Sequence, residues 1–195
     1  MKRFISIISA ILLLSSAVFA EDDYDGGDFY DDDYVYEQNG AGDQFLKIDI
    51  AANFPLNFGD KLYVGLGASV GYSYFLNKYV AVGGDAIIGW NNSLGQKPLI
   101  TVPVTFGVTV QPYIGKFEFP ISAGIGFATI SCQNLTYFPG FSAKISAGAY
   151  FRFNETWSLG IDSIGYWLPQ WFMSDSSKID NGFFATLGLS LRYHF

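Results

Sequence analysis

Cysteine, histidine and charged residues are scarce in this sequence, and each scarcity excludes a class of protein. Cys132 is the only cysteine among 195 residues, so an internal disulfide and a thiolate metal cluster are excluded. After residue 20, no apolar run reaches the roughly 18 to 20 residues that a transmembrane helix needs. Only 15% of the residues are charged, whereas 50% are hydrophobic and 18% aromatic. This composition is rich in apolar residues for a soluble domain, so an apolar environment must face part of the surface.

The first residues have the pattern of a secretory signal peptide. Lys2 and Arg3 form a basic start, residues 5–14 are an apolar run, and residues 18–20 supply a cleavage pattern. The alternative, a single transmembrane anchor, is disfavoured because the apolar run is too short. No cysteine follows the cleavage position, which argues against a lipoprotein. We therefore expect residues 1–20 to be removed after export.

Acidic residues are concentrated in the segment that follows. Ten of the 18 acidic residues lie in residues 21–43, whereas residues 44–195 hold eight acidic and nine basic residues. Such a segment is typical of a disordered acidic extension, here a periplasmic tail, and its charge argues against nucleic acid as a partner. Loose binding of divalent cations and docking to a basic periplasmic partner stay open. A calcium-loop frame is incomplete because Glu opens it, Asp closes it and no helix precedes it; its members are Glu21, Asp23, Asp25, Gly26 and Asp32.

From residue 44 onward, apolar and polar residues alternate with a period of two, which indicates β-strands rather than helices. In the first segment Leu46, Ile48 and Ile50 alternate with Lys47 and Asp49. The segments approach the roughly 9 to 11 residues that a tilted strand needs to cross a bilayer. The eight segments are 44–54, 62–74, 79–90, 100–111, 117–127, 141–153, 157–162 (followed by a blurred stretch) and 183–195.

The connections between these segments alternate in length. Tight turns at residues 75–79, 113–116 and 154–157 alternate with longer connections at residues 91–98, 131–140 and 169–181, although the first outer connection is short. Short turns on one side and long loops on the other are typical of bacterial outer-membrane barrels with both termini in the periplasm. The pattern predicts an all-β fold, an eight-stranded antiparallel up-and-down transmembrane β-barrel, over residues 44–195.

A soluble eight-stranded barrel or sandwich that hides the apolar face inside is the competing interpretation. Its water-facing side would consist largely of glycine, serine and alanine, which suits a narrow lumen better than a solvent surface. Aromatic residues also gather at the segment ends, as two interfacial girdles require. One rim contains Tyr74, Tyr79, Tyr113, Phe117, Phe153, Trp157 and Tyr193, and the other contains Phe54, Trp90, Phe141, Trp167, Trp171 and Phe183.

The segment pattern and the ending LGLSLRYHF resemble the small outer-membrane proteins of the OmpX, OmpW and OmpA-barrel type. The resemblance covers residues 44–195 and is most specific at the C-terminus. In those families the last strand, with a terminal Phe, is the signal that the outer-membrane assembly machinery reads. The resemblance implies that this signal is carried here by Leu187, Leu189, Leu191, Tyr193 and Phe195.

Charged residues at the inward positions predict a network of ion pairs inside the barrel, because ionised groups in a narrow lumen need partners. Glu118 and Arg152 are expected near the same rim, and Arg192 is expected to reach Asp162 or Asp49. Two interpretations stay open, a filled lumen and a polar ion pathway. The network consists of Lys47, Asp49, Asp85, Glu118, Lys144, Arg152, Asp162 and Arg192.

The sequence offers no catalytic residue, metal site or cofactor site. The only histidine, His194, lies one residue from the periplasmic end, so it cannot form a catalytic pair with Ser or Asp in the outer loops, where enzymatic barrels of similar size place theirs. We therefore predict a non-enzymatic, monomeric protein embedded in outer-membrane lipid. Its leading role is structural or surface interaction through outer loops that hold Phe138, Trp167, Trp171 and Phe172, and the alternative is a narrow channel or a conduit for a small hydrophobic ligand.

Overall fold

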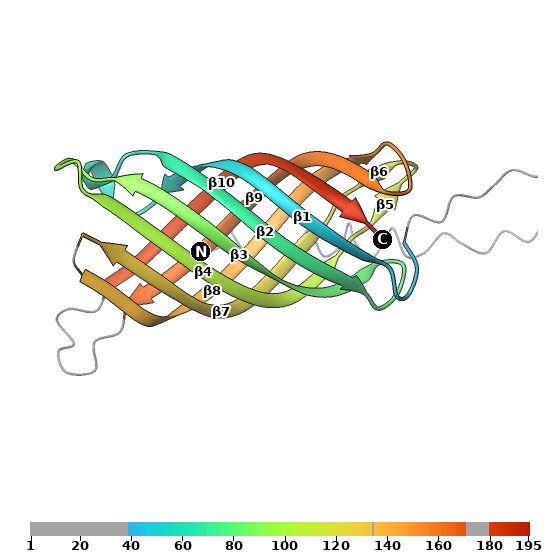
Figure 1. The fold of residues 1–195 in the computed structure, drawn as a ribbon, viewed down its shortest axis with the longest axis horizontal. Coiled ribbons are helices and arrows are strands. Elements are labelled where there is room, and N and C mark those ends of the chain that lie inside the picture. Colours follow the sequence, from blue (N-terminus) through green and yellow to red (C-terminus); the bar gives the residue numbers. More distant parts are fainter. Residues whose placement is uncertain (1–38, 134, 171–179) are drawn as a thin grey trace, which may run out of the picture. The chain divides into compact units, whose positions relative to one another are not determined.

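The computed structural model describes residues 39–133, 135–170 and 180–195, and these residues form an antiparallel β-barrel. Each long strand pairs with the next along the chain, and the last pairs with the first, so the sheet closes into a ring (Figure 1). The eight-stranded fold is therefore confirmed. Its long strands are β1 (Gln44–Pro55), β2 (Gly65–Phe75), β3 (Val80–Asn92), β4 (Pro98–Val110), β7 (Ile121–Cys132), β8 (Leu135–Arg152), β9 (Trp157–Gln170) and β10 (Asp180–His194).

The alternation in the sequence determines which side chains face outward. In β1, Ile48 and Ile50 are 58% and 71% exposed, whereas Lys47 and Asp49, which alternate with them, are buried. Successive side chains of a strand point to opposite faces of the sheet, so the apolar set covers the outside of the barrel. None of the described residues belongs to a helix that is long and apolar enough to cross a membrane.

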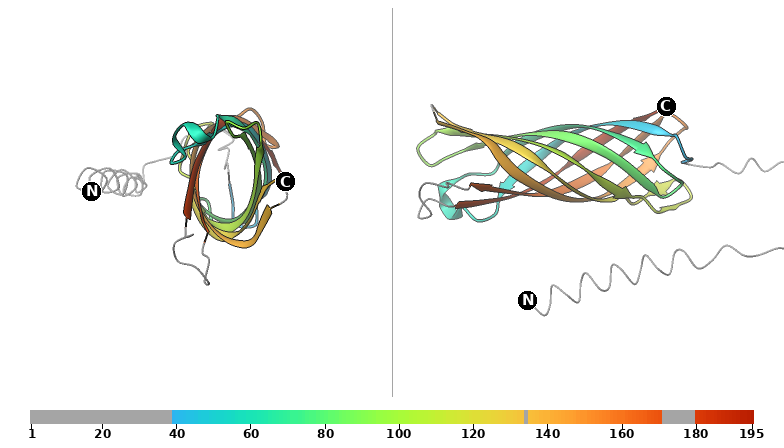
Figure 2. Two further views of the ribbon diagram at one scale, coloured as in Figure 1. Left: turned by 90° about the vertical axis from the view of Figure 1, so that its left-hand side faces the viewer. Right: turned by 90° about the horizontal axis from the view of Figure 1, so that it is seen from below.

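Strands β1 and β10 close the barrel. Their register runs from Phe45 opposite His194 to Pro55 opposite Phe184. The terminal residue takes part in this seam, because the Gln44 and Phe195 backbones exchange two hydrogen bonds of 3.2 and 3.0 Å. The end-on view of Figure 2 shows the resulting closed ring. The C-terminal residue is thus part of the wall, with its ring 56% exposed on the outer face.

The prediction of one strand over residues 117–127 is wrong at its start. A small hairpin of β5 (Tyr113–Ile114) and β6 (Phe117–Glu118) precedes β7, which begins only at Ile121. Pro120 has no N–H to donate to a ladder, so it separates the two elements. Gly115 turns the hairpin with a φ of 57°, a conformation that glycine adopts at no steric cost.

The predicted loop at residues 131–140 is also wrong, because most of it is strand. Cys132 of β7 pairs with Leu135 of β8, and β8 continues to Arg152. We call residues 130–142 the outer hairpin, since it lies at the end of the barrel opposite the C-terminus (Figure 1). The register between β8 and β9 begins only at Ala143 opposite Trp167.

Two prolines explain why the pairing of β8 with β9 stops at that point. Pro139 lies in the outer hairpin, and Pro169 lies in β9 two residues beyond Trp167. Proline removes a ladder hydrogen bond wherever it stands. In the outer hairpin, β8 is therefore paired with β7 and has no register pair with β9.

Strand β9 continues through the blurred stretch to Gln170. Its inward residues there are Ile164, Tyr166 and Leu168, which are buried together inside the barrel. Because the apolar residues move here to the inward positions, while Ser163 and Gly165 stand at outward positions, the outward apolar pattern ends although the strand continues. Leu62 was predicted to face outward at the start of the second strand. It instead lies before β2 and packs against the apolar residues buried inside the barrel.

A charge on the outer face should be costly only within the apolar belt. We expect Ile50→Lys to lower the free energy of unfolding from lipid vesicles by about 2–4 kcal/mol, as for a lysine near the bilayer midplane. Leu94, 60% exposed in the turn between β3 and β4, is the control, and Leu94→Lys should cost at most about 1 kcal/mol. Urea titration in vesicles measures both, and equal costs would contradict the membrane placement.

Candidate functional site

The lumen contains all eight charged residues that the alternation placed inside, and the structure divides them into three groups. Seven are buried, and Asp85 is half-buried. In the first group Lys47 lies between two carboxylates, with Nζ 2.5 Å from Asp162 Oδ2 and 3.1 Å from Asp49 Oδ2. The hydroxyl of Ser69 donates to Asp49 as well. Lys47 thus links β1 to β9 through Asp162, which lies 115 residues further along the chain.

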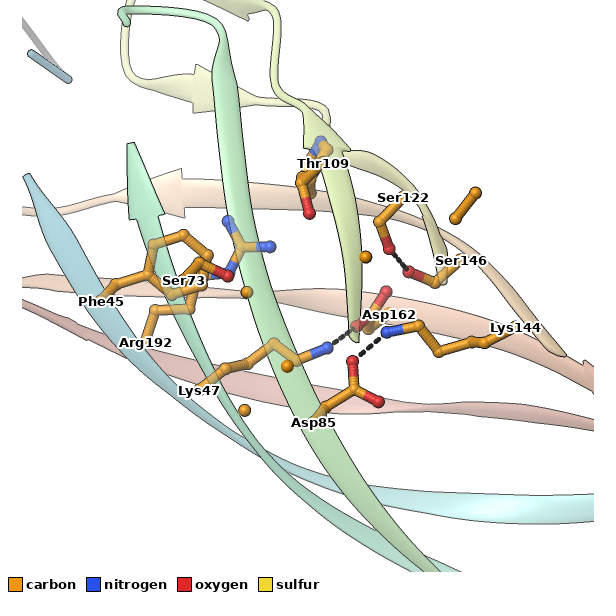
Figure 3. Close-up of a pocket in the computed structure, with 16 residues that line it drawn as sticks. Phe45, Lys47, Ser73, Asp85, Thr109, Ser122, Lys144, Ser146, Asp162 and Arg192 are labelled. Carbon is orange, nitrogen blue, oxygen red and sulfur yellow. Dashed lines mark hydrogen bonds and ion pairs between the residues drawn. The ribbon is translucent and has the colours of Figure 1, made fainter. Parts of the chain in front are cut away.

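The second group is a pair formed by Lys144 and Asp85 across the lumen (Figure 3). Thr105 supports this pair, because its hydroxyl donates a hydrogen bond of 2.8 Å to Asp85 Oδ1. The carboxylate therefore has two partners that come from different strands, β4 and β8. This is what a charge in a partly dry lumen requires.

The third group lies at the terminal mouth, the end of the barrel where β1 begins and β10 ends. Glu118 Oε1 is 3.3 Å from Arg152 Nη1, and Glu118 Oε2 is 3.4 Å from Arg192 Nη1. The expectation that Arg192 reaches Asp162 or Asp49 is wrong, because those carboxylates bind Lys47. Arg192 instead stacks on Tyr150, with 3.3 Å between the guanidinium carbon and the ring centroid.

A small cavity separates these groups. Its volume is about 40 Å³, and its wall includes Lys47, Lys144, Asp85 and the Ser122–Ser146 hydroxyl pair (Figure 3). A water molecule needs about 10–15 Å³ of such volume, so the cavity accommodates a few waters among the charges. Glycines on β2, β3 and β4 line it, which explains why the inward face is rich in residues without side chains.

An apolar cluster fills the lumen on the side away from the terminal mouth, and the alternation did not predict it. The rings of Tyr166 and Phe184 stack with centroids 5.2 Å apart, and Phe58 from the β1–β2 connection packs on Phe184 at 5.1 Å. We call this the inner apolar cluster; its buried members are Ile87, Ala128, Ile130, Ile164, Tyr166, Leu168 and Phe184.

A ring of uncharged polar groups adjoins the inner apolar cluster. The Tyr166 hydroxyl donates to Asn53 Oδ1 at 3.0 Å, and Asn53 Nδ2 donates to Asn91 Oδ1 at 2.9 Å. Gly89 makes room for this ring, since a Cβ there would lie 2.4 Å from Asn53 Nδ2 and 2.6 Å from Thr101 Oγ1. Charged, polar and apolar groups together fill most of the lumen, which keeps cavities of about 40 and 90 Å³.

His194 lies at the terminal mouth, away from the outer loops. Its Nε2 is 2.9 Å from Ser158 Oγ, both residues are buried, and its ring packs on Phe45 at 5.5 Å. Among the residues that the structure describes, no three His, Cys, Asp or Glu side chains are grouped so as to hold a metal ion. His194 and Ser158 thus form a buried hydrogen bond between β10 and β9.

Aromatic side chains pair across neighbouring strands at both ends of the barrel. At the terminal rim Trp157 contacts Tyr193 at 5.0 Å, and at the outer rim Trp167 stacks on Phe183 at 6.1 Å and meets Phe141 at 6.0 Å.

Of the four predicted surface anchors, two have a described environment. Phe138 is 62% exposed in the outer hairpin, whereas Trp167 is partly buried and donates to Asn181 Oδ1 at 3.1 Å. Trp171 and Phe172 lie outside the described residues.

The structure describes the residues of the predicted assembly signal, but it does not describe most of the predicted acidic tail. Leu187, Leu189, Leu191, Tyr193 and Phe195 all point outward, and their recognition by the assembly machinery stays a prediction. Residues 1–38, which include the predicted signal peptide and the incomplete calcium-loop frame, lie outside the described residues. The last residues assigned to the tail pack on the barrel, since Asn39 is only 2% exposed.

A closed eight-stranded barrel with an apolar outer belt, aromatic rims and a filled lumen defines the class of small outer-membrane β-barrels. Solved structures share this fold. Neisserial surface protein A is similar with a TM-score of 0.64 and 10% identity, covering 79% of this chain and 99% of that chain. OprG of Pseudomonas aeruginosa gives 0.55 and 10%, covering 82% and 98%. Ail of Yersinia pestis gives 0.51 and 20%, covering 79% and 99%.

Sequence comparison identifies the family. A protein-family model matches residues 21–193, and the chain is 30% identical over 179 residues to an uncharacterized protein of Treponema pallidum (strain Nichols), covering 83% of this chain and 81% of the relative. The chain belongs to the family of that protein. A second uncharacterized protein of the same organism is 26% identical over 172 residues, and the match spans 80% of this chain but 56% of that relative.

Breaking one buried ion pair should cost more than removing both partners. We expect Lys144→Met to destabilise the barrel by about 3–5 kcal/mol, because Asp85 keeps its charge without a cation. The double variant Lys144→Met/Asp85→Leu should recover most of this loss, since no uncompensated charge is left. Urea titrations of the four proteins of the cycle measure the coupling. A double variant whose loss equals the sum of the two single losses would show that the pair does not interact.

Proposed function

We propose that this protein is an outer-membrane barrel that acts at the cell surface through its outer hairpin, with the terminal mouth toward the periplasm. The observation that carries the proposal is the pairing pattern of β8. Leu135 and Phe138 are 79% and 62% exposed in the hairpin, and the hairpin extends past the last register pair with β9 at Ala143. Leu135 lies beyond the outer aromatic rim at Phe141, where lipid does not account for its exposure, and Phe138 meets Phe127 at that rim with 6.3 Å between the ring centroids.

The filled lumen supports interaction over transport. The inner apolar cluster occupies one part of the lumen, and Arg192, stacked between Tyr150 and Phe45, occupies the terminal mouth. A conduit for ions would need a continuous polar path, and one for a hydrophobic ligand would have to pass the buried charges. The alternative, a narrow channel or a hydrophobic-ligand conduit, is therefore less well supported.

Exposed aromatic and aliphatic anchors on an ordered hairpin suit a protein partner with an apolar recess, since a few such residues carry most of the energy of an interface. Pairing of β7 with β8 orders the backbone of the hairpin, from Ile130 opposite Tyr137 to Cys132 opposite Leu135, after a register shift between Ala128 and Ile130. Its anchors therefore lose little freedom when they are buried against a partner.

The experiment measures binding of the mature protein in lipid nanodiscs to a panel of purified extracellular proteins by surface plasmon resonance. We expect saturable binding to at least one of them, and the double variant Leu135→Ser/Phe138→Ser should weaken it about tenfold or more, which corresponds to about 1.4 kcal/mol. Leu94→Ser, at an exposed turn of the same end, is the matched control and should bind as the natural protein does. Binding that the hairpin variant leaves unchanged, or no saturable binding, would contradict the proposal.

A further inference from the structure

Residues 39–43, which we call the strap, precede β1 and lie at the terminal mouth. A turn shapes the strap, because the Gly40 carbonyl accepts from the Asp43 backbone N–H at 3.3 Å and Asp43 Oδ2 accepts from the Gly40 N–H at 2.6 Å. Gly42 has a φ of 101°, a conformation that residues with a side chain rarely adopt. The strap therefore depends on glycine at position 42.

One end of the strap is tied to the last residue of β2. The Gly42 backbone N–H donates to the Phe75 carbonyl at 2.9 Å, and the Phe75 N–H donates to the Asp43 carbonyl at 2.8 Å. Phe75 is 0% exposed, and its ring packs on Phe45 with centroids 5.9 Å apart. This end of the strap is therefore fixed to a buried part of the wall.

The other end of the strap reaches the opposite wall. Asn39 is 2% exposed, and its Oδ1 accepts a hydrogen bond of 3.0 Å from Arg152 Nη1 at the end of β8. Around the closed ring, β2 and β8 are four strands apart in both directions, through β3, β4 and β7 or through β1, β10 and β9. The strap and the Arg152 side chain thus cross the terminal mouth from one wall to the other.

A layer of bonded side chains lies between the strap and the charged cavity. Arg152 binds Glu118 at 3.3 Å, and Glu118 binds Arg192 at 3.4 Å. Arg192 donates to Gln111 Oε1 at 2.9 Å. It also belongs to the wall of the cavity of about 40 Å³, together with Ser73 (Figure 3). The strap is therefore attached to the side chains that separate this cavity from the terminal mouth.

We propose that the strap is a lid that closes the terminal mouth, and that its release opens the charged cavity to the aqueous side. A few hydrogen bonds on one short turn hold the strap, so it can open while the strands stay paired. The cavity wall includes Lys47, Lys144, Asp85 and Asp162, charges that solutes from the terminal mouth reach only when the strap is open. The inner apolar cluster fills the lumen on the other side, so the open state is a blind polar pocket and not a pore.

The experiment measures how fast a thiol in the cavity reacts with methyl methanethiosulfonate. It uses the mature full-length chain in lipid nanodiscs, where both mouths face water. The background is Cys132→Ser, which removes the only cysteine of the chain, and Ser73→Cys places a reporter in the cavity wall. Mass spectrometry follows the reaction over time.

The strap variant is Asn39→Ala/Gly42→Ala, which releases both attachments. Its matched control is Gly40→Ala, because a Cβ at Gly40 would make only ordinary contacts of 3.6 Å or more with Asp43. We expect the strap variant to raise the reaction rate of the cavity reporter about tenfold or more, since attachments at both ends are lost. The Gly40→Ala chain should react as the background does.

A second reporter, Thr186→Cys, distinguishes local opening from loosening of the whole barrel. Thr186 lies beside the inner apolar cluster, where its hydroxyl donates to the Ile164 carbonyl at 3.5 Å. Its reaction rate should be the same with and without the strap substitutions. Should the double variant fail to fold, Gly42→Ala alone strains the turn and should give a smaller rise at the cavity reporter only.

An unchanged rate at the cavity reporter would overturn the proposal, because the strap would then not close the mouth. An equal rise at both reporters would overturn it as well, since the substitutions would have loosened the barrel. The same holds if Gly40→Ala raises the rate as much as the strap variant does.

Discussion

Hydrocarbon offers no hydrogen-bond partner to a backbone N–H or C=O group, and the rest of this structure depends on that constraint. Every membrane-spanning strand needs a neighbour on both sides, so β10 must pair with β1. The exchange of hydrogen bonds between Gln44 and Phe195 meets this requirement. Closure of eight strands then leaves a narrow lumen, which side chains fill apart from small cavities.

The filling of that lumen follows from the same constraint. Inward charges are removed from bulk water by the wall, and each needs a partner at close range. Lys47 and Lys144 find carboxylates on other strands, and these pairs tie the wall together across its interior. Where the inward residues are apolar, as at Ile164 and Leu168, they pack on one another instead. The barrel is therefore polar inside near its terminal mouth and apolar inside toward the outer hairpin.

Much of the fold was predictable because its signal is local. Alternation with a period of two residues shows which side chains face lipid. A charge at an inward position, such as Lys47, leaves the series of outward apolar residues unbroken. The partners of those charges were not predictable, since they depend on the stagger of strands far apart in the chain. Arg192 illustrates this. It was expected to pair with an aspartate, but it donates hydrogen bonds to Gln111 and Glu118, both more than 70 residues away in the chain.

The inner apolar cluster and the outer hairpin escaped prediction for a different reason. After Asp162 the apolar residues of β9 move from outward to inward positions, so the outward apolar pattern ends although the strand continues to Gln170. Residues 131–140 contain Pro139 and polar residues that are typical of a loop, yet their pairing with β7 keeps them in the sheet. The apolar residues at Ile164, Tyr166 and Leu168, two apart and at inward positions, were the available signal for an internal apolar surface.

We propose that side chains fill the lumen of this barrel and that the barrel does not form an open pore. Planar-bilayer recording of the refolded mature protein tests this most directly. We expect insertion, shown by protection of the strands from protease, without reproducible current steps at either polarity. Reproducible openings whose ion selectivity reverses with Asp85→Lys or Asp162→Lys would show a continuous path through the charge network and contradict it.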